Sequence, residues 1–258
     1  MPEKKIAVIT GASSGIGLEF LRLMLQRPEV EEVWAIARRV EKLDALTKMF
    51  GPRVRTFSLD LSDRTTWTQW KDVLQKEQPR IRWLVNSAGF GKFGDYTAVD
   101  LPTSINMIDL NCSAVTAMCM LCLPYMHKGA HIVNLASQAS FQPLPYLNVY
   151  AAGKAYVRSY SRALNRELKD RHISVTAVCP GWMDTPFFDR ARTDAKQTVG
   201  VFWGMTTPKK VAQKAVRDAA AGKDMSVCGA YVKFCHAAAK LLPQRTMMRF
   251  WLMQQKIR

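Results

Sequence analysis

The residues best suited to chemistry are Ser137, Tyr150 and Lys154. Tyr150 and Lys154 are four residues apart at the start of an expected helix, so their side chains share one face. A free tyrosine has a pKa of about 10, too high for easy proton exchange at neutral pH, and a nearby ammonium lowers that pKa. Ser137 follows an expected strand, where its hydroxyl can bond the same substrate oxygen. Ser140 competes with it, but its spacing to Tyr150 differs, so we interpret Ser140 as a loop serine.

A glycine-rich turn precedes these residues and points to a dinucleotide. Thr10–Gly17 reads Thr-Gly-Ala-Ser-Ser-Gly-Ile-Gly and lies between an apolar run and an amphipathic helix. Gly11, Gly15 and Gly17 permit a tight turn and let the backbone approach a pyrophosphate, while the helix N-terminus offers free N–H groups. A bare turn is the alternative, but its place between strand and helix favours cofactor binding.

Two arginines at the end of the second expected strand indicate which dinucleotide binds. A carboxylate there would hydrogen-bond a free ribose 2′-hydroxyl, whereas an arginine favours a 2′-phosphate. The chain has no acid there and reads Arg38-Arg39 instead. These guanidinium groups can form charge-assisted bonds to phosphate, so NADP(H) is expected over NAD(H), which stays possible. The alternative, a solvated surface arginine, suits Arg39 better than Arg38.

Strand-like and helix-like segments alternate along the chain, and this alternation positions the chemical residues. Such a pattern predicts an α/β fold: one Rossmann-type doubly wound domain over residues 1–258, with about seven parallel strands and helices on both faces. An insertion is expected at 186–207 and a basic, apolar appendage at 240–258. The expected strands are Lys5–Ile9, Val33–Ala37, Val54–Leu59, Ile81–Val85, Ala130–Leu135, Ile173–Val178 and Ser226–Val232. The expected helices are Ile16–Gln26, Glu41–Phe50, Thr65–Gln78, Ile105–Leu123, Tyr150–Leu168 and Thr207–Gly222.

Composition excludes several classes of protein. In 258 residues, 48% are hydrophobic and 22% charged, so most of the chain can bury a core and disorder is excluded. The run Ala114–Met126 is too short to span a bilayer, and no secretory signal precedes Thr10, so a cytoplasmic location is expected. Cys119-x-x-Cys122 has apolar neighbours and is interpreted as a pair of buried thiols; no metal site is expected.

The net charge of +16 is concentrated near the C-terminus. From Lys196 onward there are twelve basic and two acidic residues, which contributes +10. Nucleic acid, an anionic membrane or a cofactor phosphate would each suit such charge. No nucleic-acid-binding motif accompanies it, so no nucleic acid is expected. The tail Arg245–Arg258 either lies on an anionic membrane or, as we favour, covers the pocket rim or a dimer partner.

Taken together, these motifs resemble the short-chain dehydrogenase/reductase family. The matching pieces are TGASSGIG (10–17), Asp60, NSAG (86–89), Asn111, Ser137, Tyr150-x-x-x-Lys154 and PGWMDT (180–185), in order over about residues 5–235. The resemblance implies that Tyr150 is the general acid in carbonyl reduction and the base in alcohol oxidation. It also implies that Lys154 binds the nicotinamide ribose and lowers the pKa of Tyr150, that Ser137 orients the carbonyl, and that Asn111 holds a water connected to Lys154.

The resemblance further implies the cofactor contacts. Asp60 and Leu61 would meet the adenine, Asn86 and Ala88 the ribose side, and Thr185 the carboxamide. The whole set expected to contact the cofactor is Gly11, Ser13, Ser14, Gly15, Ile16, Gly17, Arg38, Arg39, Asp60, Leu61, Asn86, Ala88, Gly89, Tyr150, Lys154, Pro180, Gly181, Met183 and Thr185.

Two positions depart from the family pattern. Ser87 replaces the second asparagine of Asn-Asn-Ala-Gly, a mild change. Ser14 stands where NADP-dependent members often carry a base, which leaves phosphate binding to Arg38.

Apolar residues before Tyr150 and after Pro180 are expected to form the wall of a substrate pocket. They suit a lipophilic ketone, aldehyde or alcohol, such as a steroid, bile acid or lipid, as in a carbonyl reductase or hydroxysteroid dehydrogenase. Arg190 or Arg192 would bind a remote carboxylate, or be solvated. A homodimer or homotetramer is expected from the resemblance, and a non-catalytic NADP(H)-binding sensor or scaffold is the alternative function. The expected wall is Phe93, Phe141, Leu144, Pro145, Tyr146, Leu147, Trp182, Met183, Phe187, Phe188, Val201, Phe202, Trp203 and Met205.

Overall fold

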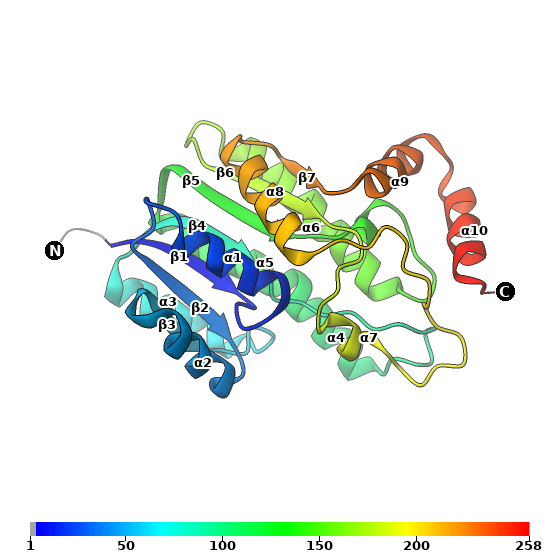
Figure 1. Cartoon of the computed structure of the whole chain (residues 1–258), viewed down its shortest axis with the longest axis horizontal. Coiled ribbons are helices and arrows are strands. Elements are labelled where there is room, and N and C mark those ends of the chain that lie inside the picture. The colour runs from blue at the N-terminus through cyan, green and yellow to red at the C-terminus, as the bar shows by residue number, and fades with distance from the viewer. Residues whose placement is uncertain (1–3, 258) are drawn as a thin grey trace.

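Seven parallel strands form one sheet at the centre of the protein in the computed structural model, which describes residues 4–257 (Figure 1). The strands are β1 (Lys5–Thr10), β2 (Glu32–Ala37), β3 (Val54–Ser58), β4 (Arg80–Asn86), β5 (Met126–Leu135), β6 (Ser174–Cys179) and β7 (Met225–Val227). Their order is β3-β2-β1-β4-β5-β6-β7, so the direction of winding reverses between β1 and β4. In such sheets ligands bind outside the carboxyl ends of the strands at this reversal.

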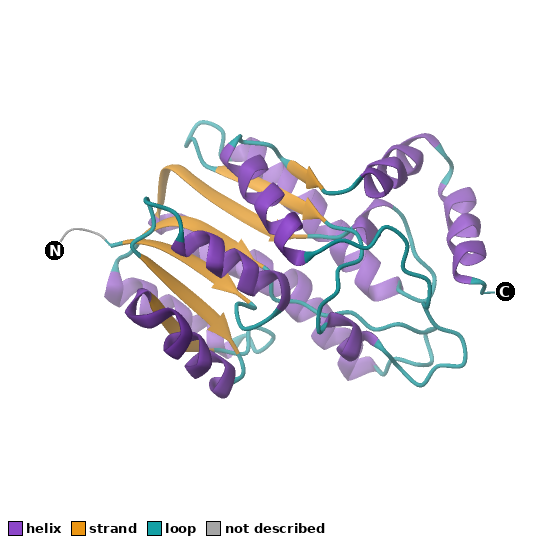
Figure 2. Ribbon diagram, viewed as in Figure 1, coloured by secondary structure: helices purple, strands orange, loops and turns teal. Residues whose placement is uncertain are grey.

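Helices cover both faces of the sheet (Figure 2). They are α1 (Gly15–Leu25), α2 (Val40–Phe50), α3 (Thr65–Glu77), α4 (Leu101–Ile108), α5 (Ala114–Cys122), α6 (Asn148–Glu167), α7 (Phe187–Ala191), α8 (Pro208–Ala220), α9 (Ala230–Leu241) and α10 (Gln244–Gln255). One apolar cluster lies under α1, α2 and α8, and the other under α3, α5 and α6. Because both faces are covered, Ile6–Ile9 is wholly buried and reads as a continuous apolar run. The expected Rossmann-type fold is confirmed.

The helix expected over Ile105–Leu123 begins earlier, at Leu101. The Asp100 carboxylate accepts a hydrogen bond from the Thr103 N–H at 2.8 Å, and Pro102 occupies the first turn, a typical helix start. A π-helical turn at Asp109–Ser113 joins α4 to α5. The continuous helix Leu101–Tyr125 is long and apolar enough to cross a membrane, but half of its apolar window is buried in the protein. Burial of this kind is typical of a core helix.

The expected seventh strand is largely wrong. Only Met225–Val227 is a strand, and residues 230–232 already belong to α9. Gly229, at a φ of +96°, turns the chain between them, a conformation that favours glycine. After it, Ala230 begins a segment that also contains Ala237, Ala238 and Ala239, and alanine is the strongest helix former.

The C-terminal helix α10 covers loops near the pocket rather than standing apart. The Trp251 indole N–H donates to the Pro145 carbonyl at 2.9 Å. The Gln255 side chain accepts from the N–H groups of Gly200 and Val201, at 3.1 and 2.9 Å, and donates to the Val201 carbonyl. The inner side of α10 thus packs on loops near the cavity, whereas the wider role expected for the tail stays a prediction; Arg258 lies outside the described residues.

Asp218 joins α8 to β7, and its charge is expected to stabilise the fold. Burial alone would raise the pKa of Asp218, but hydrogen bonds from Lys214, Ser226 and Lys223 hold it at about 2. Since this pKa lies below the unfolded value, the stabilisation is present at neutral pH and is lost as the pH falls from about 4 through 2.

We expect Asp218→Asn to lower the free energy of unfolding by about 2 kcal/mol at pH 7, and by much less at pH 2.5. Urea denaturation of both proteins at the two pH values measures the difference. A loss of equal size at both values would contradict the assignment.

Candidate active site

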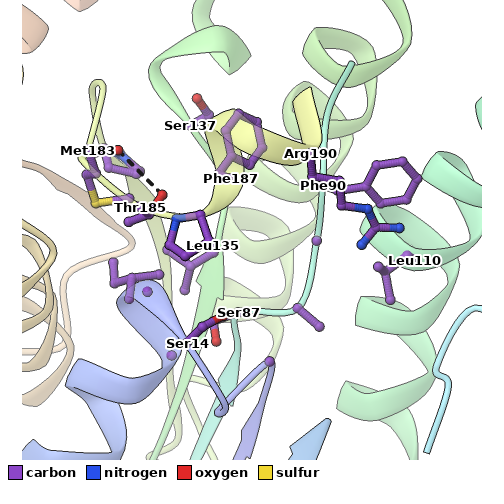
Figure 3. A pocket seen from close by; sticks show the side chains of 18 of the residues that line it. Ser14, Ser87, Phe90, Leu110, Leu135, Ser137, Met183, Thr185, Phe187 and Arg190 are labelled. Atoms are coloured by element: carbon purple, nitrogen blue, oxygen red, sulfur yellow. Dashed lines mark hydrogen bonds between the residues drawn. The ribbon is translucent and has the colours of Figure 1, made fainter. Parts of the chain in front are cut away.

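A cavity of about 780 Å³ opens at the carboxyl ends of the strands, above the reversal between β1 and β4. It extends from the glycine turn and the arginines after β2 to Ser137, Tyr150 and the loop that carries α7. Figure 3 shows Ser14, Ser137 and Phe187 around it. The structure thus brings together residues far apart in the sequence. The predicted site residues that line the cavity are Gly11, Ser13, Ser14, Gly15, Ile16, Gly17, Arg38, Arg39, Leu61, Ala88, Gly89, Ser137, Tyr150, Lys154, Pro180, Gly181, Met183 and Thr185.

The glycine turn has the shape that a dinucleotide pyrophosphate requires. Gly11 and Gly15 adopt φ values of +66° and +54°, and a Cβ on Gly11 would lie 2.9 Å from the Ala88 nitrogen. Ser14 precedes α1 in extended conformation, and its side chain makes no capping hydrogen bond. The N–H groups of the first turn therefore remain available to an anion, aided by the positive end of the helix dipole. These residues fit the pyrophosphate of a dinucleotide.

Cations gather at the end of the cavity that begins after β2. Arg38 pairs with Asp60 at 3.3 Å, and both side chains are partly exposed. Burial raises the pKa of Asp60, but hydrogen bonds from Ser62 and Arg38 outweigh it and hold the pKa below its ordinary value. Asp60 itself does not line the cavity; it positions Arg38.

Arg190, on α7, lies in the same cavity. Its guanidinium carbon lies 3.7 Å from the centre of the Phe90 ring, and Figure 3 shows the two side chains side by side. Burial and the positive charge of Arg38 lower the pKa of Arg190. Lys42, in the first turn of α2, also lines the cavity. Arg190 thus belongs to the cation cluster, whereas the sequence suggested a remote carboxylate or solvent for it.

Lys154 and Tyr150 lie close together on α6, as their spacing predicts. The Lys154 ammonium donates a 2.6 Å hydrogen bond to the Leu135 carbonyl and lies 5.6 Å from the centre of the Tyr150 ring. The Ser137 hydroxyl accepts from the Ala139 N–H at 3.1 Å, which orients it at the end of β5. All three side chains line the cavity.

Burial dominates the ionisation of this pair. It raises the pKa of Tyr150 to about 12, and the interaction with Ser137 offsets this only in part. It also lowers the pKa of Lys154 to about 8. The direction for Tyr150 is therefore opposite to the one expected, because removing water penalises the phenolate more than the hydrogen bond with Ser137 stabilises it. The phenol is held protonated at neutral pH.

Three predicted site residues do not line the cavity: Asp60, Asn86 and Asn111. Asn86 is buried and donates to the Asn134 side chain at 2.8 Å, linking β4 to β5. Asn111, in the π-helical turn, accepts from the Phe90 N–H at 3.1 Å and donates to the Phe90 carbonyl at 2.8 Å. Asn111 therefore holds the backbone of Phe90, which lines the cavity, and Asn86 joins side chains of the neighbouring core.

The far end of the cavity is apolar, as expected. Leu144, Leu147, Trp182, Phe187 and Phe188 line it. Phe141 instead contacts His236 of α9, with the two rings tilted and their centres 4.5 Å apart, and Trp203 and Met205 are about half exposed. The predicted wall residues that do not line the cavity are Phe93, Phe141, Pro145, Tyr146, Val201, Phe202, Trp203 and Met205.

The sequence analysis missed several residues that line the cavity. Phe90 and Leu135 are adjacent or nearly adjacent to motif residues, and that proximity was the available signal. Leu110 precedes the motif residue Asn111 and carried the same signal. The missed lining residues are Ile36, Ala37, Lys42, Leu59, Ser87, Phe90, Leu110, Leu135, Ala136, Gln138, Ala139, Pro186 and Asp189.

The two cysteines of Cys119-x-x-Cys122 are fully buried, and burial raises the pKa of each to about 12. The interpretation as buried thiols is confirmed. Ser140 is also buried and does not line the cavity.

Comparison with known proteins places the chain in a family. Residues 5–196 match the family model for short chain dehydrogenases. A sulfoacetaldehyde reductase of Chromohalobacter salexigens is 33% identical, over 74% of this chain and 79% of that protein. A very-long-chain 3-oxoacyl-CoA reductase of Anas platyrhynchos is 32% identical, over 71% of this chain and 64% of that protein.

A solved structure agrees with this. A short-chain dehydrogenase from Sphingobium yanoikuyae in complex with NADPH superimposes with a TM-score of 0.77 at 25% identity, covering 95% of each chain. The family match, the shared fold and the cavity at the switch point lead to one conclusion: the chain belongs to the short-chain dehydrogenase/reductase family and is an oxidoreductase that uses a nicotinamide dinucleotide.

Proposed function

We propose that this enzyme interconverts a lipophilic ketone or aldehyde and its alcohol with NADP(H), using Tyr150 as the general acid and base. One observation carries the proposal. Ser137, Tyr150 and Lys154 line the same cavity as the glycine turn and Arg38, with an apolar wall beyond them. The end with the glycine turn and Arg38 suits the cofactor, and the apolar end suits the carbonyl substrate.

Carbonyl reduction needs a hydride and a proton. When bound, the nicotinamide supplies the hydride. Tyr150, whose buried phenol is protonated at neutral pH, donates the proton to the carbonyl oxygen. The Ser137 hydroxyl donates a hydrogen bond to the same oxygen and stabilises the charge that develops there. The Lys154 ammonium then stabilises the phenolate that remains. In alcohol oxidation the same residues act in reverse.

The cation cluster supports NADP(H) as the preferred cofactor. Arg38, Arg39, Lys42 and Arg190 line one end of the cavity, where a 2′-phosphate would be held by charge-assisted hydrogen bonds. The Sphingobium relative of similar fold binds NADPH. NAD(H) lacks this phosphate and would gain less from the cluster.

The apolar wall supports a lipophilic substrate. Trp182, Phe187 and Phe188 surround the space next to Tyr150. The two relatives act, by their names, on a small sulfonated aldehyde and on very-long-chain 3-oxoacyl-CoA, so similarity alone does not select a substrate. The wall favours a steroid-, bile-acid- or lipid-like carbonyl compound.

An apolar face on α4, α5 and α6 supports a homodimer or homotetramer. Leu101, Ile105, Met120 and Tyr156 are exposed there, at 73%, 49%, 61% and 44%. A shallow groove between Trp67 and Tyr156 adjoins them. A second copy of the chain would cover this face.

The cytoplasm is the proposed compartment. The six cysteines are free thiols, which suits a reducing environment.

Replacing Tyr150 with phenylalanine removes the proton donor and little else. We expect Tyr150→Phe to lower kcat/KM for carbonyl reduction by about 10²- to 10⁴-fold while leaving NADPH affinity within about threefold. NADPH absorbance with ketosteroids, fatty aldehydes, acyl thioesters and sugars measures turnover, and NADPH fluorescence measures binding. A wild-type enzyme that binds NADPH but reduces nothing in the panel would instead favour a non-catalytic binding protein. Activity confined to sugars would contradict a lipophilic substrate.

Arg38→Ala removes one cation from the cluster. We expect NADPH affinity to fall by about 10- to 100-fold, because a hydrogen bond between charged groups is worth about 1.5–3 kcal/mol. NADH affinity should change by less than about threefold. Fluorescence titration measures both. Arg22→Ala, which removes an exposed charge on α1, is the control and should change neither. Equal losses for NADPH and NADH in Arg38→Ala would contradict phosphate recognition.

The lowered pKa of Lys154 makes cofactor binding pH-dependent. Its ammonium form is the one that binds a polyanion, and this form is lost as the pH rises through about 8. We expect the NADPH dissociation constant to rise about thirtyfold between pH 6.5 and 9.5 if the cation alone binds. Lys154→Met should bind weakly with no such dependence in this range. A wild-type profile without a transition between pH 7 and 9 would show that Lys154 does not govern binding.

A further inference from the structure

The two C-terminal helices carry a surface that the proposed reaction does not use. α9 and α10 lie at the end of the molecule opposite the N-terminus (Figure 1). From Met225 to Ile257 the sequence contains no aspartate or glutamate. It contains five lysines and arginines there: Lys233, Lys240, Arg245, Arg249 and Lys256. This stretch therefore carries positive charge, and it contains no carboxylate side chain that could neutralise it.

On α9 the outward face is both apolar and basic. Phe234 and Leu241 are seven residues apart and therefore on one side of the helix, and they are 70% and 83% exposed. Lys233 and Lys240 repeat the same spacing directly beside them and are also exposed. A helix face that meets only water typically carries polar side chains. The exposed Phe234 and Leu241 beside two lysines therefore indicate that this face contacts a membrane or another molecule.

On α10 the same combination recurs. Met247, Trp251 and Gln255 are buried and form the inner side. Phe250 and Met253 lie one turn apart and are 54% and 72% exposed. Arg245 and Arg249, also one turn apart, are exposed next to them.

The cations of this surface have no carboxylate partner within the protein. Among residues 4–257, none of the ion pairs within 4.0 Å includes Lys233, Lys240, Arg245 or Arg249. Their charge is thus available to an external anion. Exposed aromatic and aliphatic side chains set among unpaired lysines and arginines match the boundary between lipid headgroups and acyl chains.

We propose that the outward faces of α9 and α10 dock on a bilayer containing anionic lipids. Phe234, Leu241, Phe250 and Met253 enter the headgroup boundary, and the neighbouring cations bind lipid phosphates.

Docking would place the pocket loops next to lipid. α10 holds these loops through Trp251, bonded to Pro145, and through Gln255, bonded to Gly200 and Val201. This position suits a lipophilic substrate, and that consequence rests on the proposed function. The docking itself does not depend on the proposed function.

Vesicle flotation of the full-length protein tests the proposal. We expect binding to phosphatidylcholine vesicles with about 30% phosphatidylglycerol, weak binding to pure phosphatidylcholine, and release as salt rises from about 0.1 to 0.5 M. The double variant Lys233→Glu/Lys240→Glu should lower partitioning at least about tenfold. The matched control Lys48→Glu/Lys71→Glu changes the net charge equally on exposed side chains of α2 and α3 and should bind as wild type.

A second pair of variants tests the apolar contribution. Phe250→Ser should weaken vesicle binding, and Met49→Ser, which alters an exposed methionine on α2, should not. Circular dichroism confirms that each variant is folded, and NADPH affinity, which no variant touches, should be unchanged.

Three results would overturn the proposal: no preference for anionic vesicles, equal loss of binding in both charge-reversal variants, or a changed oligomeric state of Lys233→Glu/Lys240→Glu in sedimentation velocity without lipid. The last would identify the surface as a contact between protein chains.

Discussion

The hydrogen bond from the Lys154 ammonium to the Leu135 carbonyl holds the reactive part of the protein together. It joins α6 to the end of β5 at 2.6 Å. A buried ammonium needs such a hydrogen-bond partner because it has lost water. The bond replaces this water only in part, so burial still lowers the pKa of Lys154. Ser137 follows Leu135 by two residues, and Tyr150 precedes Lys154 by one helical turn. The bond therefore sets the relative position of all three side chains.

On either side of this bond the residues that line the cavity differ in polarity. Basic side chains and helix N–H groups line the end near β2, whereas leucine and aromatic side chains line the end near α7. The reactive groups lie where these environments meet. Burial keeps the Tyr150 phenol protonated and able to donate. The buried amide of Asn111 holds the backbone of Phe90 without lining the cavity itself.

Local patterns predicted most elements because strands buried on both faces and amphipathic helices leave clear periodicities. The predictions failed where two local signals competed. Ser226–Val232 contains apolar residues typical of a strand, yet Gly229 turns the chain and a helix follows. The start of α4 was missed although Asp100 and Pro102 mark it, because the apolar pattern begins only after them.

The sequence by itself determined the order of the elements, the class of sheet, the glycine turn and the pairing of Tyr150 with Lys154, since each depends on residues close together in the chain. Only the tertiary structure decided that Arg190 joins the cations near Arg38, that Asn111 bonds the Phe90 backbone, and that burial raises the pKa of Tyr150. These outcomes depend on desolvation and on contacts between distant segments, and local spacing contains no measure of either.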